Sequence, residues 1–303
     1  MADLSVKIAG VAFANPVIAA SGVFGFGREY ARMYPLKELG GISCKGTTLE
    51  PREGNPAPRI AETPCGMLNS VGLQNPGVDV FIRDYLPWLR QQGTVLISNI
   101  AGKSVEDMCE VAEKLSETDV DMIELNISCP NVKQGGVAFG TTCAGAAEAT
   151  AQVRKHCKKP LIVKLSPNVT DIAEIAKAVE SEGADAVSLI NTVTGMRIDP
   201  KTRRPILKNN TGGLSGRAVF PIAVRMVWQV YQAVQIPIIG MGGIYSGEDA
   251  VEMMLAGASA VQVGAAVITT PYAPLNIVAQ LNQFLDENGI ATAAELTGGV
   301  RPW

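Results

Sequence analysis

Eight short runs of apolar residues, each four to six residues long, recur along the chain between segments with helical spacing. Because the runs are continuously apolar rather than alternating, they are typical of parallel strands covered on both faces. Eight such strands alternating with helices predict an α/β protein with a (β/α)8 barrel, the TIM-barrel architecture. The runs are Val17–Ser21, Gly41–Lys45, Val95–Asn99, Met122–Ile127, Leu161–Leu165, Ala186–Asn191, Ile238–Met241 and Ala260–Val263.

Two of the intervening segments show the helical pattern clearly. In Asp171–Glu182 the apolar residues are spaced three and four positions apart and a glycine follows, and Glu248–Leu255 has similar spacing. At the N-terminus, Leu4–Ala14 alternates apolar and polar residues around Gly10, which predicts a β-hairpin that closes the floor of the barrel. We expect residues 1–303 to form one domain, since no linker-like change of composition interrupts the chain.

Composition and charge exclude several classes of protein. Of the 303 residues, 47% are hydrophobic and 18% are charged, which is incompatible with a disordered chain. The 26 basic and 29 acidic side chains give a formal charge of −3 with no basic run, so no nucleic-acid-binding surface is expected. Two uncharged stretches, 226–247 and 253–285, contain prolines, glycines and amides and do not suit a membrane-spanning helix. Without a signal sequence or anchor, we expect a cytoplasmic protein that does not bind membranes.

The cysteines and the single histidine indicate that the chain holds no metal site. No two of the six cysteines lie closer than 14 residues apart, so zinc-ribbon and iron–sulfur spacings are absent. His156 stands in a basic cluster where a helix C-terminus is expected. Four of the cysteines are interpreted as buried structural residues, namely Cys44, Cys109, Cys143 and Cys157.

Polar residues end six of the eight predicted strands. The active site of such a barrel lies at the C-terminal ends of its strands, so these side chains are predicted to share one mouth. Cations and amides without a metal-binding set suit a planar anionic ligand rich in carbonyl and imide groups. The residues are Ser21, Lys45, Asn99, Asn126, Lys164, and Asn191 with Thr192.

Glycine-rich turns follow the last two predicted strands, at Gly240–Ile244 and Val263–Ala266. Loops at these positions bind phosphate in many barrels, because glycine lets backbone N–H groups approach closely. The alternative is an ordinary turn that needs positive φ. Tyr245 stands where a dinucleotide fingerprint needs its third glycine, so the chain has no recognisable nicotinamide-binding motif.

Two further residues, Cys129 and Lys164, are candidates for a direct role in catalysis. Cys129 follows the fourth strand and precedes a glycine-rich stretch, where a thiol is suited to act as a nucleophile or a base. Lys164 lies inside an apolar strand, although lysine is seldom buried without a partner. It is interpreted as a Schiff-base amine or as a fixed cation beside an anionic cofactor ring; the structural alternative is a lysine that reaches the barrel rim.

Eight motifs follow one another along the chain: Ala20–Gly22, Lys45–Thr48, Asn69–Gly77, Asn126–Asn131, Val163–Asn168, Ile190–Thr192, Gly212–Gly216 and Gly240–Ile244. With these motifs in this order, residues 4–290 resemble the class 1 dihydroorotate dehydrogenases, in particular the class 1B catalytic subunits of pyrimidine biosynthesis. The resemblance implies an FMN enzyme that oxidises (S)-dihydroorotate to orotate. It implies that Cys129 removes the C5 proton while a hydride leaves C6 for flavin N5, with Lys45 and Lys164 as further catalytic residues.

The same resemblance implies which residues contact each ligand, and no metal is among them. Amides can pair with the imide and carboxylate edges of the substrate, and a lysine can stabilise negative charge near flavin N1. The flavin is expected against Ser21, Lys45, Gly46, Asn99, Asn126, Lys164 and Ile190, and its phosphate against Gly216, Gly242, Gly243, Gly264 and Ala265. The substrate is expected against Lys45, Asn69, Ser70, Val71, Gly72, Leu73, Asn126, Asn191 and Thr192.

Class 1B relatives pass electrons to NAD⁺ through a second subunit with FAD and a [2Fe–2S] cluster, in a heterotetramer of two catalytic and two electron-transfer chains. The resemblance implies the same partner here. The alternatives are a class 1A-like enzyme that uses fumarate, a related pyrimidine reductase, a lyase that forms a Schiff base on Lys164, and a non-catalytic binding barrel. Arg217, Ala265 and the tail 297–303 depart from the pattern of the family.

Overall fold

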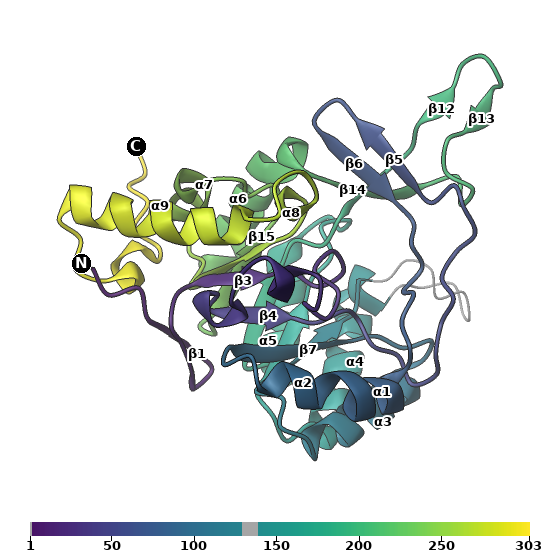
Figure 1. The fold of residues 1–303 in the computed structure, drawn as a ribbon. Coiled ribbons are helices and arrows are strands. Elements are labelled where there is room, and N and C mark those ends of the chain that lie inside the picture. The colour runs from purple at the N-terminus through teal and green to yellow at the C-terminus, as the bar shows by residue number, and fades with distance from the viewer. Residues whose placement is uncertain (1, 129–138) are drawn as a thin grey trace.

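Eight parallel strands close into a barrel in the order β10-β15-β16-β3-β4-β7-β8-β9 in the computed structural model, which describes residues 2–128 and 139–303 (Figure 1). Every barrel strand lies within two residues of a predicted run at each end, which confirms the TIM-barrel prediction. The strands are β3 (Val17–Ala19), β4 (Gly41–Ser43), β7 (Val95–Ile100), β8 (Met122–Asn126), β9 (Leu161–Lys164), β10 (Ala186–Leu189), β15 (Ile238–Met241) and β16 (Ala260–Val263).

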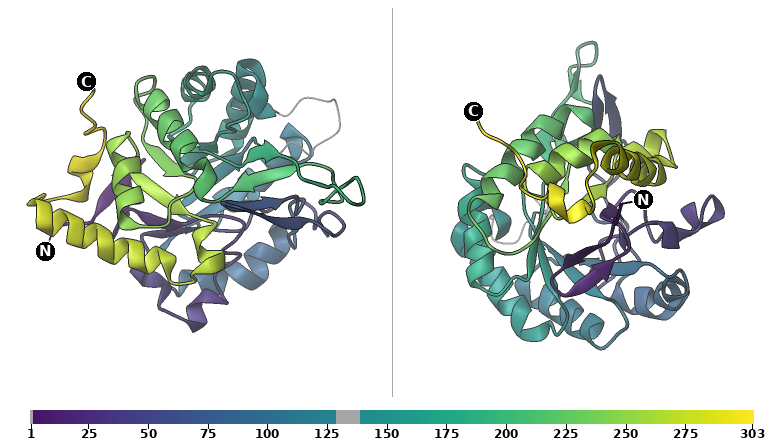
Figure 2. Two further views of the ribbon diagram at one scale, coloured as in Figure 1. Left: turned by 90° about the horizontal axis from the view of Figure 1, so that it is seen from above. Right: turned by 90° about the vertical axis from the view of Figure 1, so that its left-hand side faces the viewer.

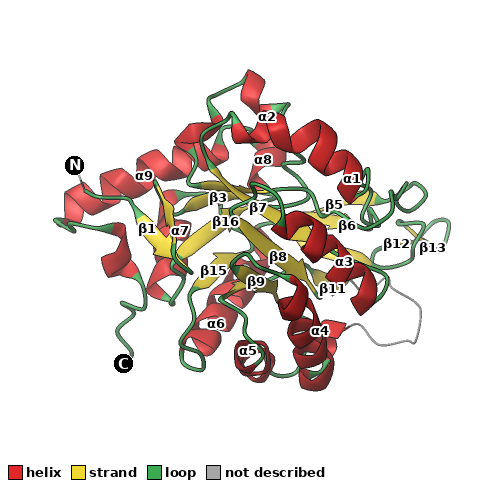
Figure 3. Cartoon of the chain, turned by 90° about the horizontal axis from the view of Figure 1, so that it is seen from below, coloured by secondary structure: helices red, strands yellow, loops and turns green. Residues whose placement is uncertain are grey.

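Helices surround the strands on the outside (Figures 2 and 3). The predicted helix at 171–182 is α5, which Asp171 caps by accepting hydrogen bonds from the N–H groups of Ala173 and Glu174. The α-helices are α1 (Val78–Val80), α2 (Leu86–Arg90), α3 (Val105–Ser116), α4 (Cys143–His156), α5 (Ile172–Ser181), α6 (Phe220–Tyr231), α7 (Gly247–Leu255), α8 (Ala266–Thr269) and α9 (Ala273–Asn288). A π-helical turn, η3 (Phe81–Tyr85), joins α1 to α2, and 3₁₀ turns lie at η1 (Tyr30–Arg32), η2 (Leu36–Glu38), η4 (Phe139–Thr141), η5 (Arg217–Val219) and η6 (Ala293–Leu296). None of the helices in the described ranges is long and apolar enough to cross a membrane.

The N-terminal hairpin lies where the sequence predicts it. Strands β1 (Val6–Ile8) and β2 (Val11–Phe13) pair antiparallel and directly precede β3, at the N-terminal ends of the barrel strands. The Phe13 side chain is 1% exposed. A Cβ added at Gly41 would lie 3.0 Å from the Phe13 ring, so the first residue of β4 must be small for the ring to pack there.

A second sheet, which the apolar runs do not predict, lies at the opposite end of the molecule from β1 (Figure 1). Its strand order is β11 (Val193–Gly195), β14 (Gly212–Ser215), β6 (Gly66–Asn69) and β5 (Ile60–Thr63), and the hairpin β12 (Ile198–Asp199) with β13 (Arg204–Pro205) projects beyond it. These strands are two to four residues long and half-exposed, so they leave no continuous apolar run in the sequence.

The cysteine predictions are confirmed at three positions and wrong at one. Cys44, Cys109 and Cys157 are buried, whereas Cys143 is exposed. Cys143 is the first residue of α4, and the residue type alone does not tell which side of a helix faces solvent. The helix C-terminus predicted at His156 is confirmed, since α4 ends there.

Replacing Phe13 with alanine is expected to lower the free energy of unfolding by about 3–5 kcal/mol, because it leaves a cavity between the hairpin and the barrel. Urea denaturation followed by circular dichroism measures the change. Lys7→Ala in the same hairpin is the control, because Lys7 is exposed and its removal is expected to cost less than about 0.5 kcal/mol. Equal losses in the two variants would contradict the packing role of Phe13.

Candidate active site

The amides predicted to bind substrate meet at the C-terminal end of the barrel. Asn126 ends β8, and Asn191 follows β10 by two residues. Asn191 Nδ2 donates to Asn126 Oδ1 over 3.3 Å, and the N–H of Thr192 donates to Asn191 Oδ1 over 2.8 Å. The two amides therefore orient one another, and their remaining polar atoms are available to a ligand with carbonyl and N–H edges.

The loop after β4 approaches both β7 and the segment 69–73. A Cβ added at Gly46 would lie 2.8 Å from Asn99 Oδ1 and 3.8 Å from the Leu73 side chain. Residues predicted to contact the flavin and residues predicted to contact the substrate are thus neighbours here. Lys45, one position earlier, is half-buried, and its N–H donates to the carbonyl of Gly25 over 2.9 Å.

The second sheet brings Asn69 and Thr192 to the same region. Asn69 Nδ2 donates to the carbonyl of Gly213 over 3.3 Å. A Cβ at Gly213 would lie 1.9 Å from Thr192 Oγ1, so only glycine allows β14 to approach this side chain. The Ser70 hydroxyl is buried and has no hydrogen-bond partner in the described part of the chain. A buried hydroxyl without a partner is what a polar ligand at this segment would satisfy.

Glycines predicted to hold a phosphate come together from separate loops. Gly216, Gly242 and Gly243 all have positive φ, and a Cβ at Gly243 would lie 2.9 Å from the carbonyl of Gly216. A Cβ at Gly242 would lie 3.2 Å from Ile190, another predicted flavin contact. Gly264 directly follows β16, and among the described residues a Cβ added there would have one neighbour within 4 Å, the Ala20 side chain at 3.4 Å. Ala20 directly precedes Ser21. Bare backbone on adjacent loops is the arrangement that cradles a phosphate.

Two asparagines that were not predicted as site residues hold these loops in place. Asn75 accepts from the N–H of Thr48 at 3.1 Å and donates to Thr48 Oγ1 at 2.8 Å and to the carbonyl of Leu73 at 2.7 Å. Asn168 donates to the carbonyl of Thr192 at 3.0 Å and accepts from the N–H of Thr194 at 2.8 Å. Both stand in motifs quoted for the family resemblance, but a linking role between loops is visible only in three dimensions.

Lys164 has the buried partner that its position requires. Its side chain is 7% exposed, and its Nζ lies 3.9 Å from Oε2 of Glu124 in the middle of β8. Burial tends to raise the pKa of Glu124, but the Lys164 ammonium and hydrogen bonds from Asn99, Ser188 and Gln262 outweigh it and hold that pKa below its usual value. The alternative in which Lys164 reaches the rim of the barrel is therefore wrong. Glu124 was not predicted, although a glutamate in the middle of an apolar strand is a signal for such a partner.

Cys129 lies outside the described residues. The residue before it, Ser128, is anchored at the mouth: its N–H donates to Asn126 Oδ1 over 3.1 Å and its hydroxyl donates to the carbonyl of Lys164 over 2.9 Å. The chain therefore leaves β8 next to Asn126 and Lys164, two residues predicted to contact the flavin.

Of the departures from the family pattern, Arg217 has a defined position. It is exposed, and its guanidinium carbon lies 4.3 Å from the centre of the Tyr245 ring, a cation–π arrangement. Ala265 precedes the short helix α8.

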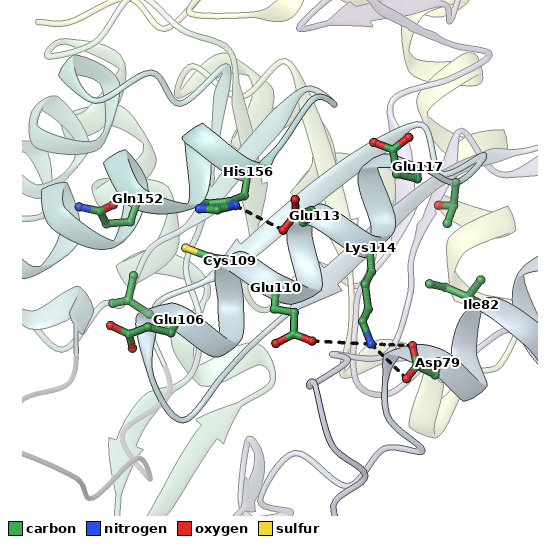
Figure 4. A pocket seen from close by; sticks show the side chains of 12 residues that line it. Asp79, Ile82, Glu106, Cys109, Glu110, Glu113, Lys114, Glu117, Gln152 and His156 are labelled. Atoms are coloured by element: carbon green, nitrogen blue, oxygen red, sulfur yellow. Dashed lines mark hydrogen bonds and ion pairs between the residues drawn. The ribbon is translucent and has the colours of Figure 1, made fainter.

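A groove of about 1040 Å³ lies elsewhere, on the outside of the barrel against α3 (Figure 4). Figure 4 shows Lys114 turned toward Asp79, and His156 turned toward Glu113. None of the predicted site residues lines this groove. The lining residues are Asp79, Ile82, Val105, Glu106, Cys109, Glu110, Glu113, Lys114, Glu117, Thr118, Gln152 and His156.

The fold and the strand-end residues define a (β/α)8-barrel protein with an amide- and lysine-rich site at the mouth. The family model for dihydroorotate dehydrogenase matches residues 3–285. The chain belongs to the dihydroorotate dehydrogenase family, which confirms the resemblance seen in its motifs.

Individual relatives support this over the whole chain. The catalytic subunit of dihydroorotate dehydrogenase B (NAD(+)) of Parabacteroides distasonis is 56% identical over 301 residues, covering 99% of this chain and 99% of the relative. The protein of that name from Anoxybacillus flavithermus is 55% identical, covering 100% and 97%. Among solved structures, dihydroorotate dehydrogenase of Eimeria tenella in complex with ferulenol matches with a TM-score of 0.80 at 25% identity, over 98% of this chain and 88% of that one.

Thiol labelling tests the burial of the cysteines. Cys65 and Cys143 are exposed and are expected to react completely with a maleimide at pH 8. Cys44 is expected to stay unlabelled over the same time, because complete burial raises its pKa to about 12 and the thiolate is the reactive form. Peptide mass spectrometry of the native protein reads the result, with the guanidinium-unfolded protein as the control in which Cys44 reacts. Labelling of native Cys44 as fast as Cys65 would contradict its burial.

Proposed function

We propose that the chain is the catalytic subunit of an NAD⁺-linked dihydroorotate dehydrogenase, which oxidises (S)-dihydroorotate to orotate in pyrimidine biosynthesis. The observation that carries the proposal is the identity of 55–56% to catalytic subunits of that name across nearly the full length of both chains. The convergence of amides from β6, β8 and the segment after β10 supports it, because orotate and its reduced form are planar or nearly planar rings with imide and carboxylate edges.

FMN is proposed as the cofactor on this chain. The residues fit it: Gly216 and Gly243 bring backbone without side chains together from two loops, where N–H groups can approach a phosphate closely, and Lys164 supplies a buried positive charge. When bound, FMN accepts the hydride from substrate C6. Among the residues proposed to hold it, Ser21, Gly264 and Ala265 come from the ends of β3 and β16, and Lys45, Gly46, Asn99, Asn126 and Ile190 come from the ends of β4, β7, β8 and β10.

The substrate is proposed to bind between the second sheet and the barrel. Asn69, Asn126 and Asn191 pair with its imide and carboxylate edges, Ser70 supplies a buried hydroxyl, and Lys45 supplies positive charge for the carboxylate. Val71, Gly72, Leu73 and Thr192 complete the contacts. Directional contacts along the edges of the ring hold it in one orientation, with C5 and C6 toward the reacting groups.

Cys129 is proposed to take the proton from C5. A free thiol has a pKa near 8.5, so at neutral pH it is a weak base that must lose its own proton before it can accept one. The hydrogen bonds of Ser128 to Asn126 and Lys164 support the assignment, since they fix the residue next to Cys129 beside the proposed substrate amides.

A partner subunit is proposed to carry the electrons onward. The relatives are named catalytic subunits, which implies that they act with a second subunit. By the resemblance, that subunit holds FAD and a [2Fe–2S] cluster, reduces NAD⁺ and assembles two to two with this chain. The names of the relatives favour this acceptor over the fumarate of class 1A, and they lend no support to a pyrimidine reductase, a Schiff-base lyase on Lys164 or a non-catalytic barrel.

Anaerobic titration of the FMN-loaded chain with dihydroorotate tests the proposed function. The flavin absorbance near 450 nm is expected to bleach in proportion to the substrate added, because the half-reaction needs only this chain. Dihydrouracil, which lacks the carboxylate, is the control and is expected to leave the spectrum unchanged at the same concentration. A chain that binds FMN but stays yellow with dihydroorotate would refute the assigned substrate.

Cys129→Ser is expected to slow flavin reduction by dihydroorotate at least about 100-fold, because a serine hydroxyl is a poorer base. Stopped-flow spectroscopy measures the rate, and FMN binding is expected to be unchanged. Cys143→Ser is the matched control and is expected to react at the rate of the unaltered chain, since Cys143 is exposed on α4. Near-normal reduction in Cys129→Ser would remove Cys129 from the role of base.

A further inference from the structure

Glu124 is a fully buried carboxylate to which the proposed mechanism gives no role. It is 0% exposed, in the interior of the barrel, and its partners come from five of the other barrel strands. Ser43 of β4, Asn99 of β7, Ser188 of β10 and Gln262 of β16 each donate a hydrogen bond to it, and Lys164 of β9 faces it.

The two oxygens of the carboxylate have different surroundings. Oε1 accepts from Ser188 Oγ and Gln262 Nε2, both at 2.8 Å. Oε2 accepts from Asn99 Nδ2 at 2.6 Å and from Ser43 Oγ at 2.9 Å, and it lies 3.9 Å from Lys164 Nζ. One oxygen is therefore held by the barrel interior, while the other holds two side chains proposed to contact the flavin.

The charge of Glu124 follows from these partners. Burial disfavours the ionised form, but the nearby ammonium and the donated hydrogen bonds more than offset it, so the pKa is lowered and the group is an anion at neutral pH. An anion with this many fixed donors keeps one orientation, and through Oε2 it restricts where Asn99 and Lys164 can lie.

We propose that Glu124 is a positioning residue for the flavin: its Oε2 fixes the Lys164 ammonium and the Asn99 amide, and its negative charge balances Lys164 so that the flavin does not face an uncompensated cation. The inference rests on the proposed function, since it requires FMN at these residues.

Neutralising the carboxylate has two predictable effects. In Glu124→Gln, one of the two acceptor oxygens becomes an NH2 group, so the remaining oxygen can serve Ser188 and Gln262 or Asn99 and Lys164, but not both pairs. Asn99 and Lys164 then compete with Ser188 and Gln262 for a single acceptor. The Lys164 cation is also left without its counter-charge, and a net positive charge near the ring favours the reduced, more negative flavin.

The experiment is a double-mutant cycle of Glu124→Gln and Lys164→Met, read by FMN titration of the apoproteins and by the reduction potential of bound FMN at saturating FMN. In the unaltered background, Glu124→Gln is expected to raise the FMN dissociation constant roughly tenfold or more. It is also expected to shift the equilibrium toward reduced flavin about tenfold, which is about 30 mV for a two-electron couple. In the Lys164→Met background, the same substitution is expected to change the dissociation constant less than about threefold.

Glu113→Gln is the matched control. It makes the same chemical change on the outside of α3, where Glu113 is exposed and faces His156, so neither readout is expected to move. If Glu124→Gln does not fold, the double variant Glu124→Gln with Lys164→Met decides. Recovery of folded protein supports the pairing, because the double variant differs from the single one only in lacking the unpaired cation. Continued failure to fold overturns the pairing.

An equal loss of FMN affinity in both backgrounds, or an unchanged potential in Glu124→Gln, would overturn the inference, because a purely structural carboxylate acts independently of Lys164 and leaves the potential of bound flavin unaltered. Failure of the unaltered chain to bind FMN would overturn the proposed function, and this inference with it. FMN binding with a silent Glu124→Gln would overturn the inference alone.

Discussion

A carboxylate in the interior of a closed barrel cannot reach water, so the strands around it must supply everything it needs. Glu124 obtains four hydrogen bonds and a counter-charge from five other strands. Leaving such a group unpaired costs about 3–5 kcal/mol, which makes any barrel that closes in another register unfavourable. The observed register sets Asn99 beside Glu124, and Lys164 beside both Asn126 and Ser188. The strand register that supplies the partners of Glu124 in the core therefore also aligns the side chains at the mouth.

Above this core, amide side chains join loops whose backbones pair through isolated bridges, such as Thr47 with Ile100 and Arg52 with Asn75. Asn75 ties the loop after β4 to the segment 69–73, and Asn168 ties the loop after β9 to the strand that follows Thr192. Loops held on a rigid barrel can be precise without being part of the barrel sheet, which is how a common scaffold carries a specific site. The second sheet also holds part of the site in place, because the close approach of Gly213 sets the position of the Thr192 side chain.

The barrel strands were predictable because burial on both faces leaves a continuous apolar run, as in β15 (Ile238–Met241). The second sheet was not, because its strands pair residues as distant as Asn69 and Gly213 and are only half-buried. The same limit applies to Cys143, whose exposure depends on the neighbours of α4 rather than on its own type.

For the site, the sequence by itself determined which residues stand at the strand ends and that they match one family, since strand ends and motifs are local features of the chain. Only the tertiary structure decided which of them touch. Three contacts join segments far apart in the sequence: Lys164 with Glu124, Asn126 with Asn191, and the close backbone approach of Gly243 to Gly216. Such contacts depend on the closure and register of the barrel, which arise from the packing of the whole chain and from no single segment of it.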